Sequence, residues 1–315
     1  MRSVSASLER TRIWIRAMRL PFLTATLVPV VLGTAIAWYQ RELFNLVYFV
    51  VTLSSVALVH IGTNLTNDYY DHLSGNDEAN SKFSPFSGGS RVIQEGQIAA
   101  RHILCAALLC FVGATVLGTY LLVTTQKVAI VFFGLTGILC GFFYTASPVR
   151  IGYHRLGELA VGFGFGPLTL IGSYWIQTSS FDLVAAMASV PVGILILLVL
   201  LINEFPDYEA DRAVGKRTLV VLLGREKAAR VYRSLLVLTY VFIAAMVLAR
   251  FFPILCLGVL LTIPIAYRAM AISRRCYASF PELLPANAAT IALHLLVGIC
   301  LTGGFILSKL LDGIA

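Results

Sequence analysis

Charge is scarce in this chain of 315 residues. Only 13% of the residues are Asp, Glu, Lys or Arg, whereas 58% are hydrophobic, and the mean hydropathy is +0.84. Soluble globular proteins carry a charged share of about 25%. The composition therefore excludes an ordinary soluble domain and indicates an integral membrane protein that resides in a lipid bilayer.

Several motifs of common catalytic and binding sites are also missing. The sequence has no Gly-x₄-Gly-Lys-Ser/Thr loop, no Gly-x-Ser-x-Gly elbow and no His-Glu-x-x-His pair. The six cysteines form no Cys-x-x-Cys pair, so neither a zinc site nor a disulfide framework is indicated. The formal charge of +8 comes from basic residues in the loops between apolar runs rather than in a stripe, which argues against nucleic-acid binding.

Long apolar runs are what the sequence has in quantity. A helix needs about 20 apolar residues to cross a bilayer. We therefore expect one all-α transmembrane domain over residues 1–315, with about nine membrane helices arranged as two four-helix halves and a ninth helix. The predicted spans are 21–39, 44–66, 103–124, 127–147, 156–176, 183–204, 231–250, 252–271 and 288–308.

The basic residues divide unequally between the two ends of these spans. One end, which holds the N-terminus and the loops after the second, fourth, sixth and eighth spans, carries twenty of the 24 Lys and Arg residues. An excess of Lys and Arg marks the cytoplasmic side of a membrane protein. We expect the basic segment 1–20 and the motif-bearing loops 67–102 and 205–230 to lie in the cytoplasm.

Two polar stretches stand at the ends of the second and sixth spans. They read Asn64-Leu-Thr-Asn67-Asp68-Tyr-Tyr-Asp71 and Asn203-Glu-Phe-Pro-Asp207-Tyr-Glu-Ala-Asp211. Steps of three and four residues place these side chains on one face of a helix. They could be solvated helix ends, but carboxylates beside hydrocarbon are costly, and like charges one turn apart favour a bound cation. Hard oxygen ligands suit Mg²⁺, so we predict that the two faces hold a metal-bound diphosphate.

Basic residues follow the acidic stretches at short range, among glycines. They are Lys82, Arg91, Lys216 and Arg217. Lys and Arg neutralise the charge of a departing phosphate group, so we assign these four to substrate binding, although positive-inside topology alone could also explain them. We add Asn64 and Asn203, which begin the two acidic stretches, to the predicted substrate-binding residues.

Aromatic residues near the motif side form a third group. Tyr and Trp commonly mark the membrane interface without any chemical role. Aromatic faces can also stabilise a cation. Tyr144, which closes the fourth predicted span, and Tyr153, which follows it, are our candidates for such a role.

At this point the motifs resemble those of the UbiA-type intramembrane prenyltransferases. The resemblance covers essentially the whole chain and rests on Asn67-Asp68-x-x-Asp71, Asp207-x₃-Asp211 and Gly215-Lys216-Arg217-Thr218-Leu219. Within the family, the chain is most similar to the 1,4-dihydroxy-2-naphthoate polyprenyltransferases of menaquinone synthesis. That similarity rests on Asn64-Leu-x-Asn67-Asp-Tyr-x-Asp71, Arg91-Val-Ile-x-x-Gly96, Tyr144-Thr-x-x-Pro148 and Leu156-Gly157-Glu158.

The resemblance implies transfer of a polyprenyl group from a Mg²⁺-bound prenyl diphosphate to an aromatic acceptor. It implies a site with two Mg²⁺ ions, whose ligands would be Asn67, Asp68, Asp71, Asp77, Asp207 and Asp211. Asp77 enters this set because the position where the family often has a further Asp is Gly75 here. The implied catalytic residues are Asp71, Asp207, Arg91 and Tyr144, with Tyr144 shielding an allylic cation from water.

Several alternatives stay open at the level of the sequence. The acceptor could instead be 4-hydroxybenzoate, a chlorin or haem, or a glycerol phosphate ether. In another class, a cation-coupled transporter could also use intramembrane acids, although transporters place their sites near the bilayer midplane on broken helices. The menaquinone assignment predicts a prokaryotic inner or plasma membrane. Prenyl chain length and oligomeric state are not determined by the sequence.

Overall fold

The protein is a bundle of helices in the computed structural model, which describes residues 2–82, 84 and 86–313 and side chains from Leu8 onward. No β-strand occurs among these residues, in agreement with the predicted all-α class. The helices are α1 (Arg2–Met18), η1 (Leu20–Leu23), α2 (Thr24–Arg41), α3 (Leu46–Ser74), α4 (Asn76–Ala79), α5 (Ala100–Thr125), α6 (Ala129–Phe142), η2 (Ile151–Tyr153), α7 (Gly157–Phe163), η3 (Gly164–Leu168), α8 (Thr169–Thr178), α9 (Leu183–Ala213), α10 (Leu219–Leu223), α11 (Arg225–Leu248), η4 (Ile254–Thr262), α12 (Ile263–Cys276) and α13 (Leu284–Asp312).

The predicted count of nine membrane spans is not confirmed. Within the described part of the chain, eight helical segments are long and apolar enough to cross a membrane. The predicted span at 127–147 corresponds to α6, a shorter apolar helix of 14 residues that ends at Phe142. Turns and a bend occupy the rest of that span, residues 143–147, and Pro148 directly follows it.

The second and sixth predicted spans continue as helices beyond their expected ends. Helix α3 runs to Ser74 and α9 runs to Ala213, so both acidic stretches lie on helices and not in loops. The three- and four-residue spacing therefore does place the acidic side chains of each stretch on one helical face. Short helices α4 and α10 lie in the connections that follow.

Helix α9 is the most buried of the candidate spans and packs against α11, α13 and the segment from α7 to α8. The crossing with that segment occurs at η3, a π-helical turn that contains Pro167. A Cβ atom added to Gly166 would lie 2.6 Å from the Cα of Gly193 on α9. The two backbones are thus in direct contact, as small residues allow in membrane helix pairs.

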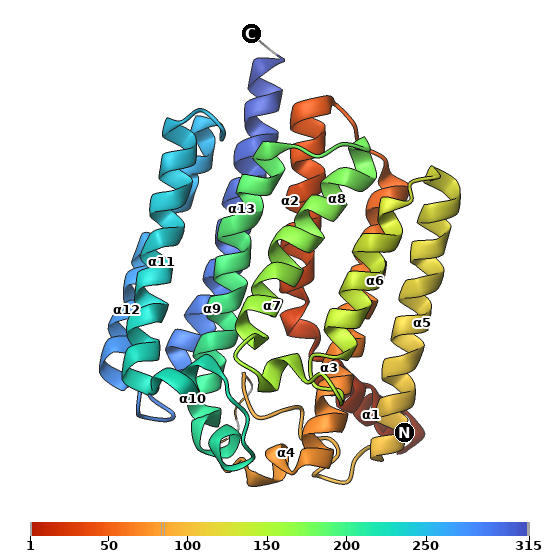
Figure 1. Ribbon diagram of the computed structural model, residues 1–315, viewed down its shortest axis with the longest axis vertical. Helices are drawn as coiled ribbons and strands as arrows, with labels where there is room; N and C mark the ends of the chain where they lie inside the picture. Colours follow the sequence, from red (N-terminus) through yellow and green to blue (C-terminus); the bar gives the residue numbers. More distant parts are fainter. Residues whose placement is uncertain (1, 83, 85, 314–315) are drawn as a thin grey trace.

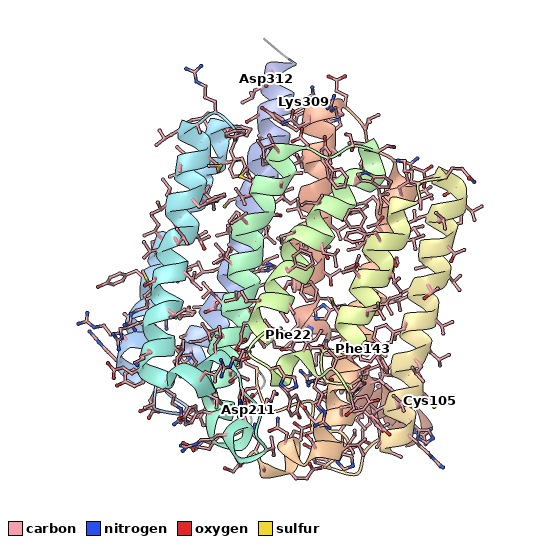
Figure 2. All side chains as sticks on the ribbon, viewed as in Figure 1. Phe22, Cys105, Phe143, Asp211, Lys309 and Asp312 are labelled. Carbon is pink, nitrogen blue, oxygen red and sulfur yellow. The ribbon has the colours of Figure 1, made fainter. Side chains whose placement is uncertain are left out.

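The two ends of the bundle differ in character. Figure 1 shows the N-terminus, α1, α4 and α10 at one end, and the end of α13 at the other. Figure 2 places Asp211 at the first end and Lys309 and Asp312 at the opposite end. The basic N-terminal helix and both acidic stretches therefore share one end of the bundle. That this end faces the cytoplasm remains a prediction from the basic-residue count.

Candidate active site

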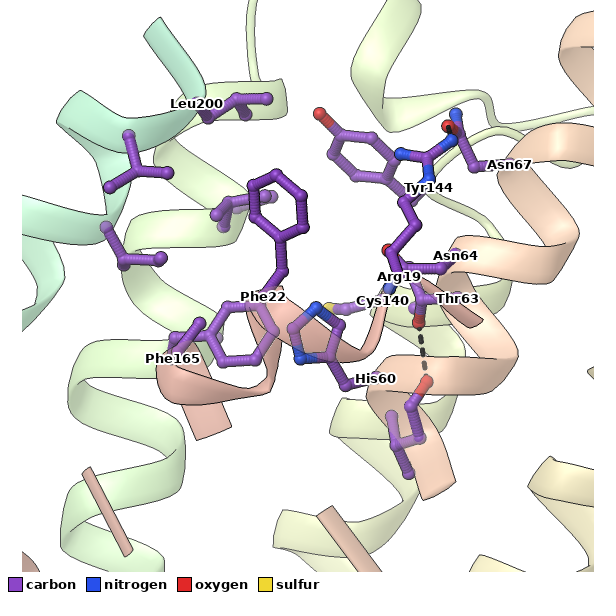
Figure 3. A pocket seen from close by; sticks show the side chains of 18 of the residues that line it. Arg19, Phe22, His60, Thr63, Asn64, Asn67, Cys140, Tyr144, Phe165 and Leu200 are labelled. Atoms are coloured by element: carbon purple, nitrogen blue, oxygen red, sulfur yellow. Dashed lines mark hydrogen bonds between the residues drawn. The ribbon is translucent and has the colours of Figure 1, made fainter. Parts of the chain in front are cut away.

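A cavity of about 940 Å³ opens between α2, α3, α6, α7, α8 and α9 (Figure 3). Its polar end is lined by Asn67, Asp71, Asp77, Asp207 and Asp211. The stretch of α3 that lines it reaches from Asp71 back to Thr52, which at 1.5 Å per residue is about 28 Å. That length is close to the hydrocarbon thickness of a bilayer.

The remote end of the cavity is apolar. Leu121, Ile130 and Ile176 line it there and pack with Trp175 in one buried cluster. Between the two ends lie aromatic and small side chains, including Phe22, Phe165 and Gly137. The cavity therefore joins a carboxylate-rich site near the end of the bundle to a long apolar tube inside it.

The turn after α3 brings the first acidic stretch back onto the second. Gly75 ends α3 with a φ of 75°, a left-handed conformation that favours glycine. The chain reverses there, and the amide of Asn76 donates to Asp211 Oδ1 at 3.2 Å. The amide of Asn80 donates to Asp207 Oδ1 at 2.8 Å. Sequence reasoning missed both asparagines, although Asn76 directly follows Gly75 and Asn80 lies four residues later.

A glycine loop also joins the two stretches. Gly88 and Gly89 both have positive φ angles, 78° and 74°. The backbone N–H of Gly88 donates to Asp207, and the backbone N–H of Ser90 donates to Asp68 Oδ1 at 3.2 Å. The loop thus gives one backbone donor to each acidic helix. Its glycines matter because their conformation is strained for other residues.

Asp77 is buried on α4 and borders the cavity. The amide of Gln94 donates to its Oδ2 at 3.3 Å, and the guanidinium of Arg91 donates to its backbone carbonyl. Burial, together with the negative charges of Asp71 and Asp68, raises the pKa of Asp77 to about 8. A neighbouring cation would lower that pKa again, because it favours the charged form.

Lys216 bridges the two acidic helices. Its Nζ lies 3.4 Å from Asp211 Oδ1 and 3.6 Å from Asp71 Oδ2. Burial alone would lower the pKa of Lys216, but the two carboxylates outweigh burial and hold the pKa well above its ordinary value. The Tyr153 hydroxyl donates to Asp71 Oδ1 at 2.7 Å and lies 2.8 Å from the hydroxyl of Ser74. Burial and the Asp71 charge raise the pKa of Tyr153, which therefore stays a protonated donor.

Arg19 is a further cation at this site that sequence reasoning missed. It lies between α1 and η1 in a left-handed conformation, with a φ of 52°. Its guanidinium forms an ion pair with Asp68 and donates to Asn67 Oδ1 at 3.3 Å. The only signal in the sequence was its position as the last basic residue before the first span. There it was counted among the topology-determining arginines.

The remaining predicted residues divide into two sets. Asn64, Asn203 and Tyr144 line the cavity, where the amide of Asn64 donates to the Met18 carbonyl at 3.3 Å. Asn203 Oδ1 accepts a hydrogen bond of 2.8 Å from a buried asparagine of α13.

The second set lies away from the cavity wall. Lys82 and Arg217 are exposed and do not line the cavity. The backbone of Arg217 instead pairs with the chain at Tyr153, which lies behind Asp71 and Lys216. The side chain of Asp68 is also buried behind the cavity surface.

The donor atoms at the polar end suit a hard cation. Asp68 Oδ2, Asp211 Oδ2 and Asn76 Oδ1 are buried and accept no hydrogen bond. In the part of the chain that the structure describes, no three Asp, Glu, His or Cys side chains are grouped closely enough to hold an ion by themselves. Mg²⁺ commonly completes its shell with water and substrate phosphate oxygens, so carboxylates and amides spread over two helices fit that ion.

Comparison with known proteins gives a consistent assignment. The model of the UbiA prenyltransferase family matches residues 26–280, most of the chain. This chain belongs to the UbiA prenyltransferase family. It is 31% identical over 226 residues to the 1,4-dihydroxy-2-naphthoate octaprenyltransferase of Bacillus subtilis (strain 168), which covers 72% of this chain and 70% of the relative. It is 30% identical over 230 residues to the enzyme of the same name from Escherichia coli (strain K12), with coverage of 73% and 74%.

The fold of this UbiA-family enzyme is also found among solved structures. A UbiA homolog from Archaeoglobus fulgidus bound to DMAPP and Mg²⁺ superposes with a TM-score of 0.63 at 16% identity, over 92% of this chain and 99% of the homolog. The predicted UbiA-like helical fold and the prenyltransferase class are thus confirmed. The transporter alternative is set aside by the family assignment, whose relatives are named as prenyltransferases.

Proposed function

We propose that this UbiA-family prenyltransferase transfers a polyprenyl group from a prenyl diphosphate to 1,4-dihydroxy-2-naphthoate, in menaquinone biosynthesis, with Mg²⁺ as cofactor. One observation carries the proposal: a single cavity, about 28 Å long in all, joins two carboxylate-bearing helix ends to an apolar interior. A prenyl diphosphate has the same two-part character, an anionic head and a long apolar tail. The names of the relatives supply the acceptor.

The diphosphate would bind at the polar end of the cavity. The residues that would hold it with its metal are Asn67, Asp71, Asp77, Asp207 and Asp211 at the cavity wall, and Asp68, which is buried behind that wall. When bound, Mg²⁺ supplies positive charge that stabilises the leaving diphosphate. Two ions, as we propose, would balance most of the charge of the five carboxylates.

The cationic side chains would act on the leaving group. Lys216 lies within 3.6 Å of carboxylates from both helices, so it already stands between the groups that would hold the diphosphate. Arg91 lines the same end of the cavity. Both would stabilise the charge that develops on the diphosphate as the bond to the prenyl chain breaks. Arg19 would donate to the diphosphate oxygens once its ion pair with Asp68 is broken.

The prenyl chain would occupy the apolar part. Figure 3 shows Phe22, Phe165 and His60 around one region of the cavity, with Tyr144 and Asn67 toward the other. Thr26 Oγ1 and His60 Nδ1 are 3.0 Å apart, so the ring is held by its neighbour on α2. Tyr144 would face the reacting carbon, where its aromatic surface stabilises positive charge and excludes water.

The acceptor is tested by prenyl transfer with the purified protein. A labelled long-chain prenyl diphosphate and Mg²⁺ are offered with 1,4-dihydroxy-2-naphthoate, 4-hydroxybenzoate, a chlorin, or a glycerol phosphate ether. We expect Mg²⁺-dependent product with the naphthoate alone. Product with a different acceptor would keep the reaction and overturn the pathway, and no diphosphate release with any of them would overturn the proposal.

The roles of the acidic residues are tested in the same assay. Asp71→Asn and Asp207→Asn should each lower transfer on the order of 10²-fold or more, since each removes a charged ligand or positioning group. Asp182→Asn is the matched control: Asp182 caps the far end of α9, and Asn caps helices equally well. Near-normal transfer by either active-site variant at saturating Mg²⁺ would refute the assigned roles.

A further inference from the structure

Two buried glutamates beside the active site have no role in the account above. Glu158 lies in the first turn of α7, and Glu204 lies on α9, three residues before Asp207. Their exposed fractions are 1% and 6%. Glu204 lines the cavity, and its carboxyl group is close enough to that of Glu158 for a hydrogen bond between them.

The hydrogen bonds around these two groups imply a shared proton. Glu158 Oε1 accepts from the backbone N–H of Leu219 at 2.6 Å. Glu158 Oε2 and Glu204 Oε2 are both buried and have no hydrogen-bond donor from any other group. Two ionised carboxylates would repel each other there, and each would leave an oxygen unsatisfied. One proton held between them removes the repulsion and gives one carboxyl group a donor for the other.

The pair lies next to the place where the acceptor ring must react. Tyr144 is close to it: a Cβ atom added to Gly157, the residue before Glu158, would lie 3.1 Å from the Tyr144 hydroxyl oxygen. Glu204 and Tyr144 border the same cavity as Asp207. The other charged groups that face Glu204 are Lys216 and Asp211, on the diphosphate side. The carboxylate pair is therefore at the junction of the polar site and the apolar tube.

We propose that the Glu158–Glu204 pair is the base that accepts the hydroxyl proton of the aromatic acceptor, with Glu204 as the member that contacts the acceptor. This inference rests on the proposed function, because it requires an acceptor with a ring hydroxyl. With one proton already shared, the pair carries a single negative charge. A second proton removes that charge from a buried site, where an ionised carboxylate is costly.

The reaction balances with this base. As the ring carbon bonds to C1 of the prenyl chain, the C1–O bond breaks and its electron pair leaves with the diphosphate. The hydroxyl proton passes to the glutamate pair, and the hydroxyl oxygen becomes a carbonyl. Loss of CO₂ from the same ring carbon returns the electrons of that C–C bond to the ring, and the oxygen takes its proton back from the pair.

The decisive variant is Glu204→Gln, which keeps the shape and a hydrogen bond to Glu158 but cannot accept a proton. We expect kcat to fall on the order of 10²-fold, the usual contribution of a general base. KM for the prenyl diphosphate and the Mg²⁺ requirement should stay unchanged. Acceptors with more acidic hydroxyl groups should recover part of the lost rate, because they bring an ionised oxygen. Glu209→Gln on the same helix is the control, since Glu209 is exposed and paired with Arg225.

Each outcome decides the inference. An unchanged kcat in Glu204→Gln would overturn it. A lower apparent affinity for Mg²⁺ in that variant would also overturn it, because Glu204 would then be a metal ligand. If that variant does not fold, the wild type still gives an answer: transfer to the acceptor's methyl ether at the normal rate would overturn the base, and loss of transfer would support it. Absence of transfer to any hydroxylated acceptor by the wild type would instead be a failure of the proposed function.

Discussion

At the scale of single residues, two glycines, Gly152 and Gly157, leave space for the ring of Tyr144. A Cβ atom on Gly152 would lie 2.9 Å from ring carbons of Tyr144. A Cβ atom on Gly157 would lie 3.1 Å from the Tyr144 hydroxyl oxygen. Both distances are shorter than ordinary carbon contacts, so the ring can hold its place only beside glycines. The two glycines thus leave the room that this position of the Tyr144 ring needs.

Gly152→Ala should displace Tyr144 and lower prenyl transfer by about 10-fold or more, because small misplacements near the reacting carbon have large effects on rate. The assay is single-turnover transfer with saturating Mg²⁺. Gly303→Ala is the control, since a Cβ atom there meets nothing within 4 Å. Equal rates for both variants would show that the position of Tyr144 does not matter to the reaction.

Asp77 gives a second prediction at this scale. Its pKa is raised to about 8 by burial and by Asp71 and Asp68, so its neutral form predominates below that pH as long as no metal ion is bound. Since a metal ligand must be deprotonated, the apparent Mg²⁺ affinity should rise as the pH increases through 8. The measurement is Mg²⁺ titration of activity between pH 6.5 and 9, with Asp77→Asn, which should flatten the rise. A flat profile in the wild type would contradict it.

At the scale of elements, the segment from α1 to η1 is attached to the site by two arginines in different surroundings. Arg16 contacts Glu95 at 2.6 Å and Gln97 at 2.5 Å, but the side chains of Arg16 and Glu95 are 43% and 40% exposed. Arg19 forms an ion pair with Asp68, whose side chain is only 3% exposed. An exposed pair contributes little to stability, whereas breaking a buried pair leaves an uncompensated charge.

Arg19→Ala should therefore destabilise the folded protein by about 3 kcal/mol. Arg16→Ala should change the free energy of unfolding by less than about 1 kcal/mol. Thermal or denaturant unfolding in detergent measures both. Added Mg²⁺ should recover part of the loss in Arg19→Ala, because a bound cation replaces the missing charge beside Asp68. Equal destabilisation by the two variants would contradict the distinction between them.

The sequence predicted the elements of the site better than their connections. Asn67, Asp71, Asp207 and Asp211 could be placed on helix faces because helical spacing is a local property. The reversal at Gly75, which brings Asn76 and Asn80 onto α9, depends on contacts between segments about 130 residues apart, and no local pattern reports them. Arg19 was missed for the same reason: a basic residue beside a span has the same local signature whether it binds a carboxylate or only sets topology.

At the scale of the whole molecule, the helix bundle has two distinct ends, and the sequence assigned twenty of the 24 Lys and Arg residues to one of them. The expected count of nine helices is not confirmed, because the 14-residue α6 is shorter than the eight helical segments of the described chain that are long and apolar enough to cross a membrane. The assignment of the N-terminus and both acidic stretches to one end does not depend on that count. Figure 1 shows them together, with the end of α13 opposite.

The charge division predicts a topology that can be measured. With twenty of 24 basic residues at the active-site end, that end should face the cytoplasm. A reporter enzyme that works only outside the cytoplasm should be active when fused to the C-terminus and inactive when inserted in the loop at 213–217. The reverse pattern in bacterial cells would overturn the predicted orientation.

The apolar closure at the remote end of the cavity has a consequence for the membrane itself. A cavity about 28 Å long, filled with water, would conduct ions across most of a bilayer. Moving one charge through a potential of 100 mV releases about 2.3 kcal/mol, so such a leak would run continuously. Leu121, Ile130 and Ile176 close that end with side chains that do not hydrate. An apolar end of this kind would limit such a leak in a membrane that carries a potential.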